Sequence, residues 1–300
     1  MRYFRHAVAI VAAVLHAGCT TGSASRTPAP VPADAYVKTP VAFMSGGDSI
    51  RATLFVAEGG EPHPTVLFLS GFPGWPDAPP FLEPIHGAGY NVLFFPYRGT
   101  WASDGLFSAG NVLADAQAAL AFLRSPDAQT TYRIDADEIV PYGTSFGGWV
   151  ALSLAARDPS LECVAATVPA NLGVIGREWS TVEPYRTEWR TMLEQMSAEL
   201  PVRLVDGPTG LMRDVMQHSD VYDIVPLMPA LRDRTVILFG AEQDEVAPIA
   251  THYQPLADAL RATNMTALHL ATAPGGHNDP QPAWDAEIVR WLGSDCPGRE

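Results

Sequence analysis

The stretch VPYGTSFGGWVALSLA, residues Val140–Ala155, decides how the rest of this chain is interpreted. Gly143 and Gly147 each lie two positions from Ser145, and an apolar run at helical spacing follows them. The preceding EIVPY, residues 138–142, is a short β-like run. This pattern is typical either of an ordinary turn between a strand and a helix or of a turn that holds a serine hydroxyl out for attack. The remainder of the sequence has to distinguish the two.

Length and charge limit the classes of protein to which the chain can belong. Its 300 residues are enough for one large α/β domain or two small ones, and 47% of them are hydrophobic, so a sizeable core can be buried. Lys and Arg number 19 against 33 Asp and Glu, which gives a formal net charge of -14. A surface this acidic disfavours nucleic acid or an anionic membrane as a partner. It does not identify a substrate.

The beginning of the chain has the layout of a signal peptide. Two arginines precede AVAIVAAVL, residues 7–15, an apolar run too short for an ordinary transmembrane helix, and an Ala-Gly pair then leads to Cys19. This order resembles the lipobox of a bacterial lipoprotein, although His16 stands where that motif has an aliphatic residue. We therefore expect a signal peptide over residues 1–18 and a lipid on Cys19. Ordinary secretion or release into the periplasm is the alternative.

The segment after this cysteine consists mainly of small and polar residues and is rich in proline, which is typical of a flexible tether. We expect a linker over residues 19–39, a domain over 40–293 and a short tail over 294–300. An oxidising compartment would permit a bridge between Cys163 and Cys296, but the sequence leaves their pairing open. No spacing of cysteine and histidine indicates a zinc site.

Within the domain, apolar strand-like runs alternate with amphipathic segments. Gly46-Gly47-Asp48 joins the first two runs in a predicted hairpin. Further strands are predicted at residues 65–71, 90–99, 138–143, 163–170, 234–240 and 267–273, and helices at 111–125, directly after Ser145, at 252–261 and at 284–291. Such alternation predicts an α/β fold with a mostly parallel central sheet that helices cover on both faces.

One segment, from about residue 171 to 231, interrupts this alternation because it holds no convincing buried strand. Its clearest pattern is a row of apolar residues on one face of a helix, formed by Tyr185, Trp189, Met192, Met196 and Leu200. We therefore expect a helical, cap-like insertion between two strands. This apolar row can pack on the domain, contact substrate, or do both.

Ser145 needs partners because an alcohol is a poor nucleophile at neutral pH. VILFGAEQDEVAP ends one predicted strand and places Asp244 in the loop that follows, and LHLATAPGGHNDP ends the next and places His277 likewise. All three residues thus follow the carboxyl ends of strands, where open α/β sheets form their sites. Side chains at the glycines flanking the serine would collide with neighbouring backbone, and the helix that follows favours negative charge at its N-terminus.

Residues 40–293 resemble an α/β-hydrolase, with similarity to the dienelactone-hydrolase and prolyl-oligopeptidase-like branches. The motifs that carry the resemblance are LSGFPG, YRGTWASDG, GTSFGG, and the pair GAEQDEVAP and GGHND. The order Ser, Asp, His along the chain is that of the family. The resemblance implies that Ser145 is the nucleophile, Asp244 the acid and His277 the base.

The resemblance also implies an oxyanion hole formed by the backbone N–H groups of Phe72 and Phe146. Ser70 stands where many relatives carry histidine, which matters little because the donors belong to the backbone.

Other residues could fill the same roles. Glu242 is a nearby rival as the acid and Asp223 a remote one. Of the eight histidines, seven lie in the signal segment, within a predicted strand or helix, or away from the expected loop, which favours His277 as the base. Arg98 is better explained as a structural, ion-pairing residue than as a catalytic group, and Asp115 on its predicted helix likewise.

The sequence therefore predicts a serine hydrolase that acts on a small carboxylic ester and needs no metal or organic cofactor. A peptidase or amidase of prolyl-oligopeptidase-like type and an acyltransferase are the alternatives among enzymes, because the same three residues serve all of them. A lipoprotein that uses the fold only to bind a ligand is the alternative outside catalysis.

Overall fold

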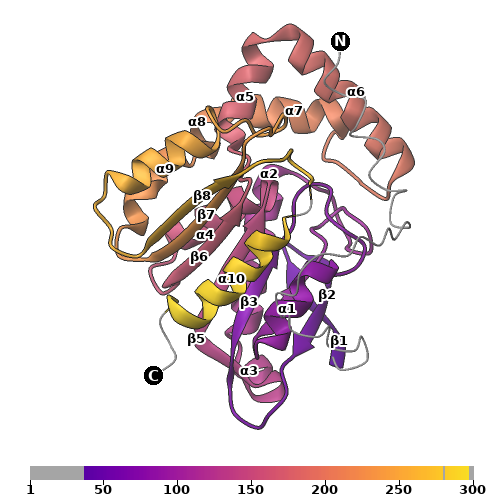
Figure 1. The fold of residues 1–300 in the computed structure, drawn as a ribbon. Coiled ribbons are helices and arrows are strands. Elements are labelled where there is room, and N and C mark those ends of the chain that lie inside the picture. The colour runs from indigo at the N-terminus through magenta and orange to yellow at the C-terminus, as the bar shows by residue number, and fades with distance from the viewer. Residues whose placement is uncertain (1–36, 280, 297–300) are drawn as a thin grey trace, which may run out of the picture. The chain divides into compact units, whose positions relative to one another are not determined.

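The computed structural model describes residues 37–279 and 281–296, and these residues are built around a single sheet of eight strands (Figure 1). The strand order is β1-β2-β4-β3-β5-β6-β7-β8. Strands β3 to β8 run parallel to one another, whereas β2 pairs antiparallel with both β4 and the edge strand β1. The strands are β1 (Val37–Ser45), β2 (Asp48–Val56), β3 (His63–Leu69), β4 (Asn91–Phe94), β5 (Ile134–Thr144), β6 (Cys163–Thr167), β7 (Thr235–Ala241) and β8 (Leu268–Ala273). The predicted α/β fold with a mostly parallel sheet is confirmed.

The predicted hairpin forms between β1 and β2. Gly46 and Gly47 occupy the turn with φ values of 57° and 91°, which residues with a side chain rarely adopt. The first strand begins at Val37, ahead of the domain boundary expected at residue 40, because residues 37–39 already pair with β2. The expected signal peptide, Cys19 and the linker up to residue 36 lie outside the described residues.

Helices cover both faces of the sheet. Helices α2 (Ala109–Leu123), α4 (Phe146–Arg157) and α9 (Tyr253–Arg261) contribute to one apolar core, and α1 (Glu83–Gly87) and α10 (Pro282–Ser294) contribute to the other. Ser108 accepts a hydrogen bond from the backbone N–H of Asn111 and so caps α2, and Ser125 caps α3 (Pro126–Tyr132) in the same way. A 3₁₀ turn, η2 (Pro80–Leu82), leads into α1.

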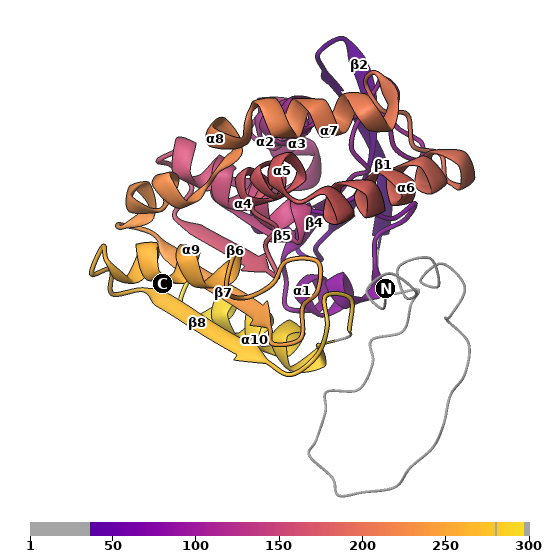
Figure 2. The same cartoon turned by 90° about the horizontal axis from the view of Figure 1, so that it is seen from above.

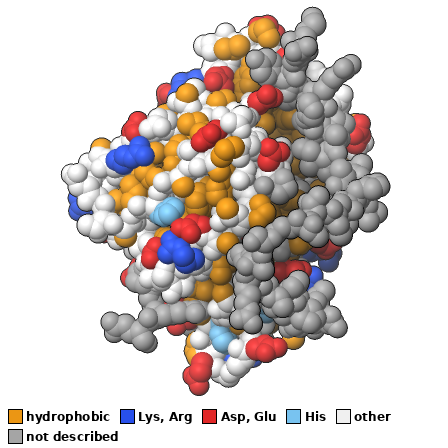
Figure 3. All heavy atoms as spheres, in the orientation of Figure 1, with side chains coloured by type: hydrophobic (Ala, Val, Ile, Leu, Met, Phe, Trp, Pro, Cys, Tyr) orange, Lys and Arg blue, Asp and Glu red, His pale blue; other side chains and the backbone are white. Residues whose placement is uncertain are grey.

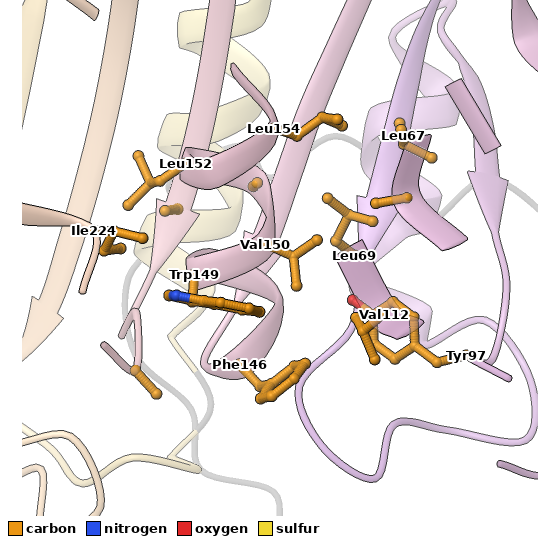
Figure 4. Close-up of a cluster of buried hydrophobic side chains, with 14 of the residues drawn as sticks. Leu67, Leu69, Tyr97, Val112, Phe146, Trp149, Val150, Leu152, Leu154 and Ile224 are labelled. Carbon is orange, nitrogen blue, oxygen red and sulfur yellow. The ribbon is translucent and has the colours of Figure 1, made fainter. Parts of the chain in front are cut away.

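Helix α4 is the most deeply buried of these elements. Every residue from Phe146 to Ala155 is buried, and apolar side chains project from several sides of the helix (Figure 4). A helix that is apolar all round needs protein contact all round. Its N-terminus is therefore held in a defined position relative to the sheet.

The insertion between β6 and β7 is helical, as expected. It contains α5 (Leu172–Thr181), α6 (Glu183–Glu199), α7 (Gly207–Gln217), α8 (Ser219–Tyr222) and η3 (Val225–Leu231), and α5 to α8 gather at one end of the sheet (Figures 1 and 2). Isolated bridges pair Val202 with Thr100 and Leu204 with Phe107, and Trp149 Nε1 donates to the carbonyl of Tyr222 at 2.7 Å. These contacts attach the insertion to the loop after β4 and to α4.

The apolar row on α6 packs against the domain. Tyr185, Trp189, Met192 and Leu200 are half-buried against the main core, but the fully buried residue of α6 is Leu193, which lies beside the predicted row. The side chain of Trp189 lies 5.5 Å, between ring centroids, from Trp179 of α5. The insertion thus has its own aromatic contacts between helices.

Where described residues are visible on the face that carries α10, charged side chains of neither sign gather into one patch (Figure 3). Acidic, basic and apolar side chains are interspersed there (Figure 3). Within the described ranges, none of the helices combines the length and the apolar character that a membrane span requires.

Cys163 and Cys296, whose pairing the sequence left open, form a disulfide with Cα atoms 5.8 Å apart. The bond joins the start of β6 to the chain just beyond α10. It closes a loop with a sequence separation of 133 residues.

Arg98 and Asp115, each expected to be structural, form an ion pair with each other. Two guanidinium nitrogens of Arg98 donate to Asp115 Oδ1 at 2.9 and 2.6 Å, and the backbone N–H of Arg98 donates to Oδ2 at 2.9 Å. The same guanidinium donates to the hydroxyl of Ser45, at the end of β1. Asp115 is fully buried and the side chain of Arg98 is 7% exposed. The pair therefore ties the hairpin and the loop after β4 to α2 with little contact with water.

We expect Asp115→Ala to lower the free energy of unfolding by about 3–5 kcal/mol, because the buried guanidinium of Arg98 is left with Asp48, 3.7 Å away and 35% exposed, as its remaining acidic partner. Equilibrium urea denaturation measures the change. Asp233→Ala is the matched control, since Asp233 pairs with Arg232 in an exposed ion pair and its loss should cost about 0–1 kcal/mol. Equal losses in the two variants would contradict the structural role of Asp115.

Candidate active site

Ser145 lies on a sharp turn between β5 and α4. Its φ and ψ of 56° and -120° are unusual for a residue with a side chain, and such strain persists only where neighbouring contacts enforce it. Those contacts are visible in the backbone: Ser145 N–H donates to the carbonyl of Thr167 at 2.9 Å, and its own carbonyl accepts from Ala170 N–H at 3.0 Å. The turn is therefore held on the side of β6.

Close packing explains the glycines around this serine. A Cβ atom on Gly143 would collide with the carbonyl of Gly147, and one on Gly147 would collide with the carbonyl of Leu69 at the end of β3. A Cβ on Gly71 would lie 3.2 Å from the Cβ of Ser145. The chain after β3 therefore runs directly beside the serine.

The structure brings Ser145, Asp244 and His277 together from three separate loops. His277 Nε2 lies 2.7 Å from Ser145 Oγ, and His277 Nδ1 lies 2.7 Å from Asp244 Oδ2. A carboxylate only accepts, so Nδ1 carries the proton and Nε2 is free to accept the proton of the serine hydroxyl. The side chains of His277 and Asp244 are 8% and 0% exposed, so water scarcely competes for these bonds.

The carboxylate of Asp244 is fixed by its own loop. Oδ1 accepts from the backbone N–H groups of Val246 and Ala247 at 2.9 and 2.7 Å, which leaves Oδ2 directed at His277. The rival acids occupy other positions: Glu242 accepts from the hydroxyl of Thr272, and Asp223 pairs with Arg177. Among the described residues, the ring of His277 forms its hydrogen bonds with Ser145 and Asp244 and not with these rival acids.

The loop that carries His277 is braced by two residues that the sequence reasoning did not single out. Gln243 hydrogen-bonds Gly275 through both its backbone N–H and its side-chain oxygen. Asp279 accepts from the N–H of Gly276 at 2.7 Å. Both lie inside the motifs quoted above, one position before Asp244 and two after His277, and an aspartate that accepts from a nearby backbone N–H is a known turn signal.

Phe72 and Phe146, the predicted donors of the oxyanion hole, lie in the two segments that meet at Ser145. Phe146 is the first residue of α4, and the N–H groups of a first turn have no partner within the helix. Phe72 follows Gly71, which packs beside Ser145. Neither N–H has a backbone or side-chain partner among the described residues. Their part in an oxyanion hole stays a prediction.

A fourth polar residue, His252, lies close to these groups although the sequence placed it in a helix. It precedes α9 and is fully buried. Burial lowers the pKa of His252 to about 4, and the nearby His277 acts in the same direction while the Asp244 carboxylate opposes it. Its imidazole is therefore neutral at physiological pH.

Across residues 37–279 and 281–296, no cluster of three or more His, Cys, Asp or Glu side chains has an arrangement suited to a metal ion.

The model of the alpha/beta hydrolase family matches residues 66–291, and the chain belongs to this family. The quorum-quenching protein AidA of Acinetobacter baumannii is 38% identical over 93 residues, which are 30% of this chain and 29% of that protein. An uncharacterized protein of Mycobacterium tuberculosis is 28% identical over 203 residues, 66% of this chain and 56% of its own length. The matches thus span 29% and 56% of these two relatives.

Solved structures with the same fold include hydrolases of two kinds. An esterase from Pyrococcus furiosus superimposes with a TM-score of 0.63 at 17% identity, covering 93% of this chain and 96% of the esterase. An acylaminoacyl peptidase from Pyrococcus horikoshii gives 0.63 at 12% identity, covering 88% of this chain and 42% of the peptidase. At these identities the likeness shows the fold, and the family supports a hydrolase.

Proposed function

We propose that this hydrolase cleaves carboxylic esters through an acyl-enzyme formed on Ser145. The observation that carries the proposal is the continuous chain of hydrogen bonds from Ser145 through His277 to Asp244. A hydroxyl, a neutral imidazole and a buried carboxylate in this order are the nucleophile, base and orienting acid of serine hydrolases.

In the first half of the reaction, Ser145 Oγ attacks the acyl carbon while His277 Nε2 takes the hydroxyl proton. The oxyanion that forms would accept from the N–H groups of Phe72 and Phe146, and the N-terminus of α4 adds a favourable dipole. Each such donor is typically worth about 3 kcal/mol of barrier. The imidazolium, held by Asp244, then protonates the leaving alcohol.

In the second half, His277 accepts a proton from water, which attacks the acyl carbon. The C–O bond to Ser145 breaks, His277 returns the proton to Oγ, and the carboxylic acid departs. An alcohol in place of water would make the same protein an acyltransferase, and an amide substrate would make it an amidase. These activities therefore differ in their substrate and acceptor, and not in the three residues that carry out the chemistry.

A substrate screen tests this proposal. Purified protein is assayed on p-nitrophenyl esters of increasing acyl length, on aminoacyl-anilides, and on esters with an added alcohol acceptor. We expect hydrolysis of esters, and covalent labelling of Ser145 by a fluorophosphonate. Preference for anilides would indicate a peptidase, transfer to the alcohol an acyltransferase, and absence of both turnover and labelling a binding protein.

We further propose that the protein is exported and anchored to a membrane through a lipid on Cys19. The layout of residues 1–18 supports this, as does the disulfide between Cys163 and Cys296, because such bonds persist mainly outside reducing compartments. The proline-rich linker would then hold the domain away from the bilayer, in the periplasm or at the cell surface, with a small ester as substrate and no nucleic acid as partner.

Cys19→Ser should release the protein into the soluble fraction of a bacterial host without changing its activity on soluble esters. One acyl chain binds membranes only marginally, at about 0.8 kcal/mol per buried methylene, so stable anchoring requires the several chains that a lipoprotein cysteine carries. Fractionation of cells fed labelled palmitate measures both location and lipid. If the unaltered protein is already soluble and unlabelled, only secretion or periplasmic release remains.

A further inference from the structure

The side chain of Asn171 links two parts of the helical insertion. Asn171 lies between β6 and α5 and is fully buried. Its Oδ1 accepts from the N–H groups of Gly173, at 3.1 Å, and Ile224, at 3.4 Å, and its Nδ2 donates to Asp223 at 2.8 Å. Gly173 lies in the first helix of the insertion, whereas Asp223 and Ile224 lie between α8 and η3. Asn171 therefore joins these two parts at what we call the base of the insertion.

The backbone of the same asparagine is bonded to the loop that carries the acid. Asn171 N–H donates to Nδ1 of His252 at 2.9 Å. A backbone N–H only donates, so Nδ1 is unprotonated and the proton of the neutral ring lies on Nε2. That Nε2 has no hydrogen-bond partner among the described residues and is shielded from water.

His252 is in turn tied to the loop of Asp244. Its backbone N–H donates to the carbonyl of Pro248 at 2.9 Å, and Pro248 follows directly after Ala247, which donates to Asp244 Oδ1. A short run of bonds therefore leads from the base of the insertion, through the imidazole of His252, to the carboxylate that faces His277. A buried imidazole with one unpaired donor is costly to keep for packing alone.

We propose that His252 is a positioning residue, which aligns the Asp244 carboxylate with His277 by holding the acid loop against the base of the insertion. The expected kinetic effects of this role rest on the proposed function. The expected effect on the hydrogen bond between Asp244 and His277 does not. The low pKa of His252 agrees with this role, because a neutral ring keeps Nδ1 available as an acceptor down to acidic pH.

Two substitutions separate the hydrogen bond from the bulk of the side chain. His252→Leu removes the acceptor, and His252→Asn places an amide oxygen near the position of Nδ1. His269→Asn is the matched control, since His269 lies on β8 near Glu287 and away from this loop. We expect the leucine variant to lose about 10²-fold in kcat with little change in KM, because misplacing a catalytic group raises the barrier without removing a substrate contact.

The asparagine variant should keep kcat within about fivefold of the unaltered protein, and the control should be unaffected. Proton NMR provides a readout that does not depend on turnover: the far-downfield resonance of the His277 Nδ1–H bonded to Asp244. We expect it to be lost or shifted in His252→Leu and kept in His252→Asn. If the leucine variant does not fold, His252→Met fills the same space without an acceptor and takes its place.

Failure of the proposed function and failure of the positioning role of His252 give different results. If the unaltered protein shows the resonance but no turnover on esters or anilides, the proposed function fails while the positioning role is still decided by NMR. If folded His252→Leu or His252→Met is merely less stable, and keeps both native kcat and the resonance, His252 serves packing alone and the inference is overturned.

Discussion

Ser145→Ala abolishes ester hydrolysis while the protein stays folded: we expect kcat on a p-nitrophenyl ester to fall by about 10⁴- to 10⁶-fold. The hydroxyl is bonded to His277 Nε2, and alanine at this position leaves the imidazole with no nucleophile to activate. Alanine has the same Cβ as serine, so the turn at φ 56° is no more strained than before. The free energy of unfolding should change by less than about 1 kcal/mol.

Ser153→Ala is the matched control for this variant. Ser153 lies on the same helix, is fully buried, and its hydroxyl has no hydrogen-bond partner among the described residues. Removing that hydroxyl should leave activity and fluorophosphonate labelling intact, whereas Ser145→Ala should lose both. A purified Ser145→Ala protein that kept about a tenth of the native kcat would show that another residue is the nucleophile.

Asp244→Asn should lower kcat by about 10⁴-fold, because the amide imposes the wrong tautomer on His277. The N–H groups of Val246 and Ala247 demand an acceptor at the position of Oδ1, so the amide oxygen is held there and the NH₂ group faces His277. Nδ1 must then accept, which moves the ring proton to Nε2. An imidazole protonated at Nε2 cannot take the proton of Ser145.

Glu242→Gln tests the rival acid with the same change of chemistry. Glu242 contacts the hydroxyl of Thr272, an interaction that glutamine preserves, so kcat should change little. Steady-state kinetics on one ester, with both variants purified side by side, ranks the two carboxylates. If Glu242→Gln proved the more damaging of the two, the acid would lie two residues upstream.

The sequence was most informative where structure follows from local pattern. Continuous apolar runs predicted the parallel strands. The positions of Ser145, Asp244 and His277 directly after three of those strands predicted that they meet at the carboxyl ends of the sheet. Helix α3 was not predicted, since Ala128 is its only buried residue and no helical periodicity results. Strand β5 begins at Ile134, earlier than predicted, because Asp135 and Asp137 interrupt the apolar run.

Contacts between distant segments could not be read in this way. The pairing of Cys163 with Cys296 and the bond between Asn171 and His252 depend on how the chain closes in space, and neither residue type signals its partner. The sequence predicts His252 within a helix and not in a catalytic loop, and so gives it no role at the site. A buried imidazole that accepts from a backbone N–H has no sequence pattern of its own.

The dispersed origin of the proposed catalytic groups would make activity a measure of native assembly. Ser145 and His277 are separated by 132 positions in the chain and meet only when β5 and β8 occupy the same sheet, with β6 and β7 between them. On refolding from denaturant, helices can regain their circular dichroism before those strands are in register. If the proposed function holds, recovered turnover would report completion of the sheet and serve as an indicator of correct folding.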